Sequence, residues 1–164
     1  MLEHLKRHAI QADAFFLVPG FFLLVGEGAL IVWDLFRRDG GPDALQTFGP
    51  VGLLLVVAGL GFALGGALTL RSNYSSTLVI RKSHQLVVHG IYRFVRHPIY
   101  LGAILVTLGG PIGMSSWIGL LPALLLIPLF IYRMGVEEGL LLEEFGEGYR
   151  VYMSNTKRLM PFVY

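Results

Sequence analysis

The sequence has no cysteine and few charged residues. Without cysteine it can form no disulfide bond, no thiolate metal site and no cysteine nucleophile. Charged residues fill 15% of the 164 positions, against roughly a quarter in an average soluble domain, and 54% of the residues are hydrophobic. Disordered chains have the opposite composition, so intrinsic disorder is excluded. The net charge of +2 is too small to point to a nucleic-acid partner, and the shortage of charge argues against an ordinary soluble domain.

Two long apolar runs dominate the N-terminal half. Residues Ala14–Trp33 include a single ionisable residue, Glu27, and residues Phe48–Leu70 include none. A run of about 20 apolar residues is long enough to cross the bilayer core as a helix. No cleavage signal follows the first run, so we interpret it as a membrane anchor. Glu27 is either a functional intramembrane carboxyl group or a residue that is protonated or paired with a neighbouring helix.

The second run is rich in glycine. The pattern Gly59-x-Gly61-x-x-x-Gly65 is close to a dinucleotide-binding fingerprint, but it lies inside a bilayer-length run and does not follow a strand. We therefore reject a Rossmann interpretation. The pattern Gly61-x-x-x-Gly65 instead predicts a close contact between two membrane helices.

The third apolar region is too long for one crossing. Residues Pro98–Tyr132 contain no charge and no histidine, and one helix of this length would extend about 52 Å at 1.5 Å per residue. The glycine- and proline-rich segment Gly109–Gly113 is expected to break the run into a helical hairpin of two short spans. The expected fold class is an all-α integral membrane bundle of about four transmembrane helices. We expect a single domain over residues 1–164, in which residues 1–70 hold two spans and residues 71–164 hold the remainder.

The connection before the hairpin is basic. Residues 71–97 hold five basic residues and no acidic residue, which by the positive-inside bias places them in the cytoplasm. Lys6 and Arg7 place the N-terminus on the same side, and we expect both termini to be cytoplasmic. Because a hairpin returns the chain to the face that it left, residues 84–100 and 133–138 should meet at one membrane face.

Two further features fit a membrane surface. Arg93 is interpreted as a contact to lipid phosphates. Four later residues follow the spacing of one helix face and predict an amphipathic cytoplasmic helix at the interface. They are Leu141, Phe145, Tyr149 and Tyr152.

Polar motifs flank the hairpin on both sides. Arg96 and His97 directly precede Pro98, a residue that suits the first turn of a helix, and a helix N-terminus attracts anions. After the hairpin, Arg133 and Glu137 share a helix face. These two residues form either an exposed ion pair or a cation and a carboxylate that face the basic segment.

Three motifs follow one another in the C-terminal half of the chain. They are His84-x-Leu86-Val87-x-x-Gly90-x-Tyr92-x-x-x-Arg96-His97-Pro98-x-Tyr100-x-Gly102, then Arg133-x-x-x-Glu137-Glu138, then Phe145-Gly146-x-x-Tyr149-x-x-Tyr152. In this order, with a hairpin between the first two, they resemble the isoprenylcysteine carboxyl methyltransferase and phospholipid methyltransferase superfamily. The resemblance covers about residues 84–161.

The resemblance implies an integral membrane methyltransferase that uses S-adenosylmethionine, needs no metal and has no Rossmann domain. Its methyl acceptor would be a lipid-like molecule in the bilayer, either an isoprenylcysteine-like carboxylate or a phospholipid-type amine. By motif position, the implied cofactor-binding residues are His84, Gln85, Leu86, Val87, Gly90, Tyr92, His97, Pro98, Ile99, Tyr100 and Glu137. The implied substrate-binding residues are Arg133 and Arg158, and the implied catalytic residues are Arg96, Arg133 and Glu138.

The two acceptor classes require different catalytic groups. A carboxylate acceptor needs no general base, only a positioning cation such as Arg133. An amine acceptor would have to lose a proton, and Glu138 or a histidine would then become the base. Asn155 stands where the eukaryotic prenylcysteine enzymes have an arginine, which weakens the case for a prenylcysteine carboxylate.

Two other functions stay open at this point. One is an NADPH-dependent reductase similar to the steroid 5α-reductases, which share the Arg-His-Pro-x-Tyr-x-Gly segment but usually have asparagine where Ile99 stands here. The other is a non-catalytic membrane protein that retains the scaffold. The sequence predicts neither the acceptor nor the oligomeric state.

Overall fold

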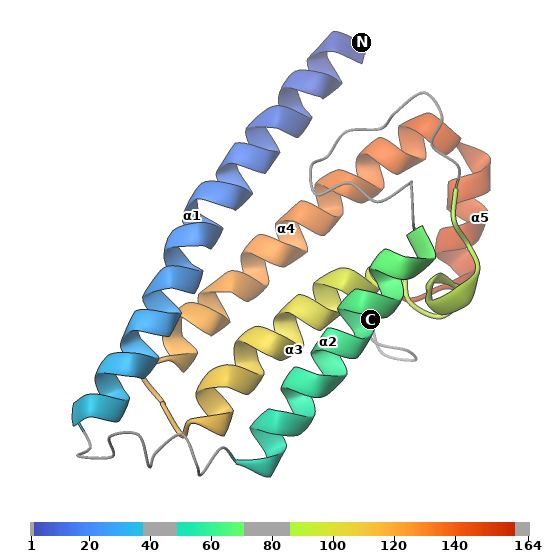
Figure 1. Cartoon of the computed structure of the whole chain (residues 1–164). Helices are drawn as coiled ribbons and strands as arrows, with labels where there is room; N and C mark the ends of the chain where they lie inside the picture. The colour runs from blue at the N-terminus through green and yellow to red at the C-terminus, as the bar shows by residue number, and fades with distance from the viewer. Residues whose placement is uncertain (1, 38–48, 71–85, 160–164) are drawn as a thin grey trace.

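The described part of the chain is built from helices. The computed structural model describes residues 2–37, 49–70 and 86–159, with side chains from residue 13 onward (Figure 1). The elements are α1 (Leu2–Arg37), α2 (Pro50–Leu70), the short 3₁₀ helix η3 (Gly90–Arg93), α3 (Pro98–Gly113), α4 (Leu120–Phe145) and α5 (Glu147–Asn155).

Three of these helices are long and apolar enough to cross a membrane. They are the Asp13–Arg37 part of α1, α2 and α4, and α3 is a shorter apolar helix of 16 residues. Large apolar side chains on their outer surfaces are exposed, such as Phe22 at 68% and Leu68 at 72%, as expected where lipid replaces water. The predicted helical membrane bundle is therefore confirmed.

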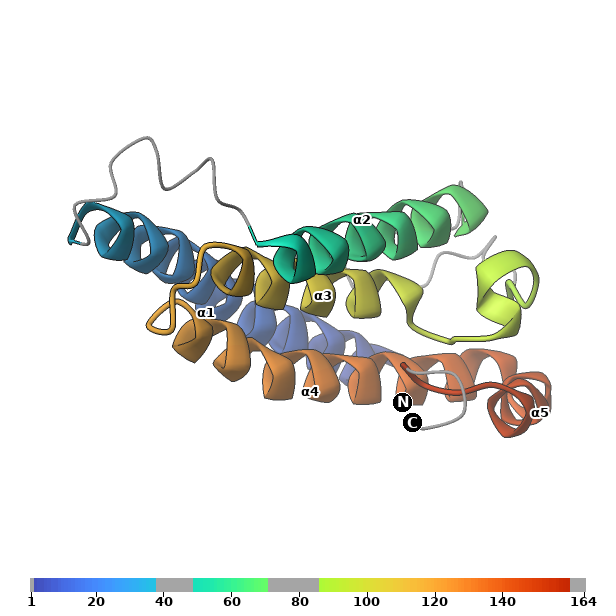
Figure 2. The same ribbon diagram turned by 90° about the horizontal axis from the view of Figure 1, so that it is seen from below.

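The helices run alternately up and down the bundle (Figure 1). Helix α1 packs along α4 and α2 packs along α3, and Figure 2 shows the two pairs side by side. The core between them is apolar and consists of Leu101, Ile104, Leu126, Phe130, Met134 and Leu159. As a result, the start of α3, the end of α4 and α5 lie together at one end of the bundle.

The predicted position of the hairpin break was wrong. Residues Gly109–Gly113 are the last turns of α3, and the chain turns at residues 114–119, where Ser115 has a φ of 52°. Gly109 and Gly113 continue the helix because they pack against α2 and the residue before it. The Gly49 amide donates to the Gly113 carbonyl at 2.8 Å, and a side chain at Gly109 would lie 2.9 Å from the Gly52 carbonyl oxygen. Close packing outweighs their low helix propensity.

The glycine contact between helices exists, but it uses other glycines than predicted. A side chain added at Gly61 would meet no atom within 4 Å, and one at Gly65 would meet only Ile91 at 3.7 Å. The buried glycines of α2 are spaced seven residues apart, which keeps them on one face toward α3. They are Gly52, Gly59 and Gly66.

The predicted continuous helix from Leu141 to Tyr152 was also wrong. Helix α4 ends at Phe145, and Gly146 adopts a φ of +53°, a conformation that glycine reaches without strain. The chain turns there into α5, which buries Tyr149 and Tyr152, while Leu141 and Phe145 stay only half-buried. Helix α5 is thus folded against the bundle.

The glycine contact gives a test of the fold. A Cβ at residue 59 would lie 2.6 Å from the Gly102 carbonyl oxygen, so Gly59→Ala must push α2 and α3 apart. We expect a loss of about 1–3 kcal/mol in the free energy of unfolding, measured by thermal unfolding in detergent. The matched control Gly61→Ala meets open space and should leave the stability unchanged or raise it. Equal effects of both variants would contradict this packing.

Candidate active site

A short backbone pairing fixes the segment before α3. The Arg96 amide donates to the Lys157 carbonyl at 2.8 Å, and the His97 amide donates to the Arg158 carbonyl at 3.1 Å. The segment that follows α5 therefore lies alongside the segment that enters α3. His97 occupies the N-cap position of α3 and Pro98 its first turn, where no backbone donor is lost.

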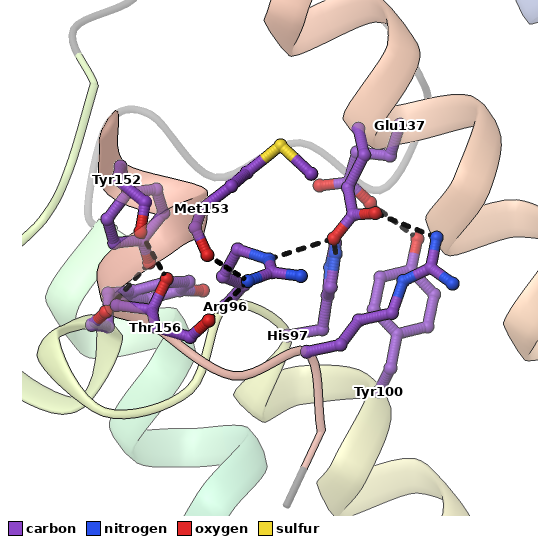
Figure 3. Close-up of polar contacts among 10 residues, drawn as sticks. Arg96, His97, Tyr100, Glu137, Tyr152, Met153 and Thr156 are labelled. Atoms are coloured by element: carbon purple, nitrogen blue, oxygen red, sulfur yellow. Dashed lines mark hydrogen bonds and ion pairs between the residues drawn. The ribbon is translucent and has the colours of Figure 1, made fainter. Parts of the chain in front are cut away.

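Three nitrogen-bearing side chains from this pair of segments contact the Glu138 carboxylate on α4. Figure 3 labels two of them, Arg96 and His97. Arg96 Nε donates to Oε1 at 2.9 Å, His97 Nε2 lies 3.1 Å from the same oxygen, and Arg158 Nη2 lies 2.8 Å from Oε2. The Glu138 side chain is only 9% exposed, so these contacts are shielded from solvent. We refer to Glu138, Arg96, His97 and Arg158 as the Glu138 cluster.

The Tyr100 hydroxyl joins a second set of polar side chains, which lies beside the Glu138 cluster. Its hydroxyl donates to Glu137 Oε2 at 2.9 Å and accepts from Arg133 Nε at 2.9 Å. Arg133 Nη1 forms an ion pair with Asp13 of α1. We refer to Tyr100, Asp13, Arg133 and Glu137 as the Tyr100 cluster. Arg133 and Glu137 are thus buried or half-buried and joined through Tyr100, and they do not form an exposed surface pair.

Helix α5 is attached to the Glu138 cluster through Arg96. Arg96 Nη1 donates to the carbonyls of Met153, at 3.0 Å, and Thr156 (Figure 3). The Tyr152 hydroxyl donates to the Tyr92 carbonyl at 2.7 Å. Burial raises the pKa of Tyr152 to about 12, so this donor keeps its proton at neutral pH. These bonds hold α5 over the entrance to α3.

The predicted meeting of residues 84–100 with residues 133–138 is confirmed for the described residues. Seven of the predicted site residues belong to the two clusters: Arg96, His97, Tyr100, Arg133, Glu137, Glu138 and Arg158. His84 and Gln85 lie outside the described residues. The individual roles assigned to all of these residues stay predictions.

The other predicted site residues lie around the clusters. Pro98, Ile99 and Tyr92 pack against α2 at Gly66. Leu86 and Val87 are half-buried, and Gly90 is exposed with a φ of +61° at the start of η3.

Two surface positions also have clear surroundings. Arg93 is exposed and lies over the Phe94 ring at 5.9 Å, and its contact to lipid phosphates stays a prediction. Asn155 is exposed and donates to the Val151 carbonyl at 2.9 Å within α5. Its side-chain amide therefore forms a hydrogen bond within α5.

Asp13 is a site residue that the sequence patterns did not predict. The residue lies one position before the predicted span Ala14–Trp33 and was therefore left outside it. A seven-residue spacing could have revealed it. The buried residues among the described side chains of α1 recur at this spacing, and they are Asp13, Gly20, Glu27 and Asp34. Three acidic residues on the buried face of a membrane helix indicate polar partners inside the bundle.

Known proteins of one family share this arrangement of sequence. The phospholipid methyltransferase family model matches residues 48–148, and the chain belongs to this family. The predicted superfamily is therefore confirmed.

Curated relatives point to the same superfamily. The protein-S-isoprenylcysteine O-methyltransferase of Mus musculus is 33% identical over 142 residues, covering 82% of this chain and 50% of the relative. The Tribolium castaneum protein of the same name is 31% identical over 127 residues, covering 75% and 45%. The Schizosaccharomyces pombe protein is 35% identical over 83 residues, covering 50% and 35%. The chain thus spans half or less of the length of these relatives.

A solved structure shares the fold. The eukaryotic intramembrane Ras methyltransferase, isoprenylcysteine carboxyl methyltransferase, superposes with a TM-score of 0.72 at 24% identity, covering 87% of this chain and 52% of that one. At this identity the likeness establishes the helical membrane fold.

The Glu138 cluster gives a stability test. Glu138→Gln would leave Arg96 and Arg158 without their shared carboxylate, and removing one partner from a buried ion pair costs about 3–5 kcal/mol. We expect a loss of that size in the free energy of unfolding, measured by thermal unfolding in detergent. The control Glu143→Gln lies on the exposed face of the same helix and should change stability by less than about 0.5 kcal/mol. A Glu138→Gln variant as stable as the control would show that the cluster does not hold the fold.

Proposed function

We propose that this chain is an S-adenosylmethionine-dependent methyltransferase that acts on a lipid-like acceptor in the bilayer. The observation that carries the proposal is the convergence of the His97–Tyr100 turn with Glu137 and Glu138 at one end of a membrane bundle. The family membership adds the reaction class. A basic cytoplasmic segment would give the soluble cofactor access from that side, with both termini on the same face.

The residues of the two clusters fit the polar end of S-adenosylmethionine. This end carries a carboxylate and an ammonium group. The Glu138 cluster sets two arginines against one carboxylate at the N-terminus of α3, an arrangement that suits an anion. In the Tyr100 cluster, Glu137 suits the ammonium group or the ribose hydroxyls.

The protein's part in methyl transfer is alignment. The cofactor supplies an electrophilic methyl group on a sulfonium centre, whose sulfur keeps the bonding electron pair when the acceptor takes the methyl group. The chain must hold the acceptor in line with that bond and exclude water. Arg133 is the residue that we assign to contact the acceptor. An amine acceptor would in addition give up a proton, for which Glu138 or a histidine is the proposed base.

Cofactor binding tests the site directly. In detergent-purified protein, we expect calorimetry to detect binding of S-adenosylhomocysteine. His97→Ala and Glu137→Ala should weaken it about tenfold or more, because each removes a hydrogen-bonding group worth about 1.5–3 kcal/mol to a charged partner. Arg93→Ala, on the exposed surface, is the control and should retain wild-type affinity. Absence of binding by folded wild-type protein would refute the proposal, and tight NADPH binding would favour the reductase alternative.

The acceptor can be found without assuming its identity. We expect incubation with methyl-labelled S-adenosylmethionine and a total lipid extract to label a lipid-soluble product, which mass spectrometry can identify. Base-labile label would indicate a carboxyl ester, and base-stable label would indicate an N-methyl group. Heat-denatured protein is the control. Cofactor binding without any labelled product would favour the non-catalytic alternative.

A further inference from the structure

Arg133, the residue of α4 assigned to the acceptor, is enclosed by residues from two other helices, α1 and α3. Its side chain is 5% exposed. Asp13 of α1 pairs with Nη1, the Tyr100 hydroxyl of α3 accepts from Nε, and the guanidinium carbon lies 4.7 Å from the centre of the Phe16 ring. The charge of Arg133 is therefore already matched inside the protein by a carboxylate.

Helix α1 brings that carboxylate to the site as part of a regular pattern. Asp13 is the first of the four buried positions that recur every seven residues along α1. It lies outside residues 48–148, the part of the chain that matches the family model. The acidic face of α1 is therefore a feature of this chain that the family match does not account for.

The internal ion pair has a consequence for acceptor binding. An anionic group that bound Arg133 would have to displace the Asp13 carboxylate from the guanidinium, and breaking an ion pair in a site shielded from solvent is costly. A neutral or cationic group would leave the pair intact. The pair therefore penalises anionic acceptors selectively.

We propose that Asp13 is a positioning and specificity-determining residue that masks the charge of Arg133, so that the site prefers a neutral or cationic acceptor end to a carboxylate. This inference rests on the proposed function in one respect, namely that the acceptor end lies at Arg133. It names the acceptor class that the sequence left open.

Two amphiphiles that differ only in charge can test this role. N-acetyl-S-farnesylcysteine carries a free carboxylate, and its methyl ester is neutral. Their dissociation constants are measured with purified protein in nonionic detergent. Wild-type protein should bind the ester at least as tightly as the acid. In Asp13→Asn the charge of Arg133 is unmasked, and the ratio of the two constants should shift at least about tenfold toward the acid.

Three variants separate charge masking from a general structural role. Asp34→Asn removes another buried acid from the same face of α1, away from Arg133, and should leave the ratio unchanged. Asp13→Glu keeps the charge and should restore the wild-type ratio. The double variant Asp13→Asn/Arg133→Gln removes both charges and remains informative where Asp13→Asn alone fails to fold. Its ratio should shift toward the acid by less than about tenfold, because the cost of breaking the pair is gone but no unmasked cation remains to attract the acid.

The opposite results would overturn the proposal. If wild-type protein prefers the acid tenfold and the double variant loses that preference, Arg133 is an open anion receptor. If Asp13→Asn and Asp34→Asn shift the ratio equally, the effect belongs to the helix as a whole. If folded protein binds neither amphiphile, Arg133 does not face the acceptor. Binding of S-adenosylhomocysteine, measured on the same samples, reports separately on the proposed function.

Discussion

The bonds at the Glu138 carboxylate connect parts of the chain that are far apart in sequence. They join the entrance to α3, the end of α4 and the segment after α5. Breaking a buried ion pair costs about 3–5 kcal/mol, which is comparable to the whole stability of many domains, about 5–15 kcal/mol. The position of α5 depends on the same bonds, because Arg96 binds Glu138 and the α5 carbonyls at once. One carboxylate therefore holds both the site and the helix that covers it.

Much of this arrangement could be predicted because bilayers impose strong rules on sequence. Length and hydropathy are sufficient to place helices such as α2, whose observed bounds, Pro50–Leu70, nearly match the predicted run. The hairpin follows from the length of the third apolar region, and a hairpin must bring its ends together. That geometric step predicted the meeting of His97 with Glu138, although it did not predict which glutamate contacts which partner.

What could not be predicted depends on side-chain contacts between helices. Whether Gly61 or Gly59 faces α3 is decided by helix rotation, and hydropathy gives no information on rotation in a helix that is apolar all round. For the same reason the turn after Gly113 was not predicted. Glycines that end a helix in water can continue a helix that packs closely on a neighbour. Asp13 was missed for a related reason: a charge near the end of a span is ordinary unless its partner is known.

The two clusters carry net charges of opposite sign, and Asp13 of α1 is the reason. The Glu138 cluster has two arginines and one carboxylate, whereas the Tyr100 cluster has one arginine and two carboxylates, one of them from α1. The clusters adjoin where the ring of His97, from the first, lies 5.5 Å from the ring of Tyr100, from the second. Without Asp13 the second cluster would be neutral, and the site would have only a positive end. A zwitterion is recognised best by two ends of opposite sign, so the N-terminal helix contributes to the site's polarity as well as to membrane insertion.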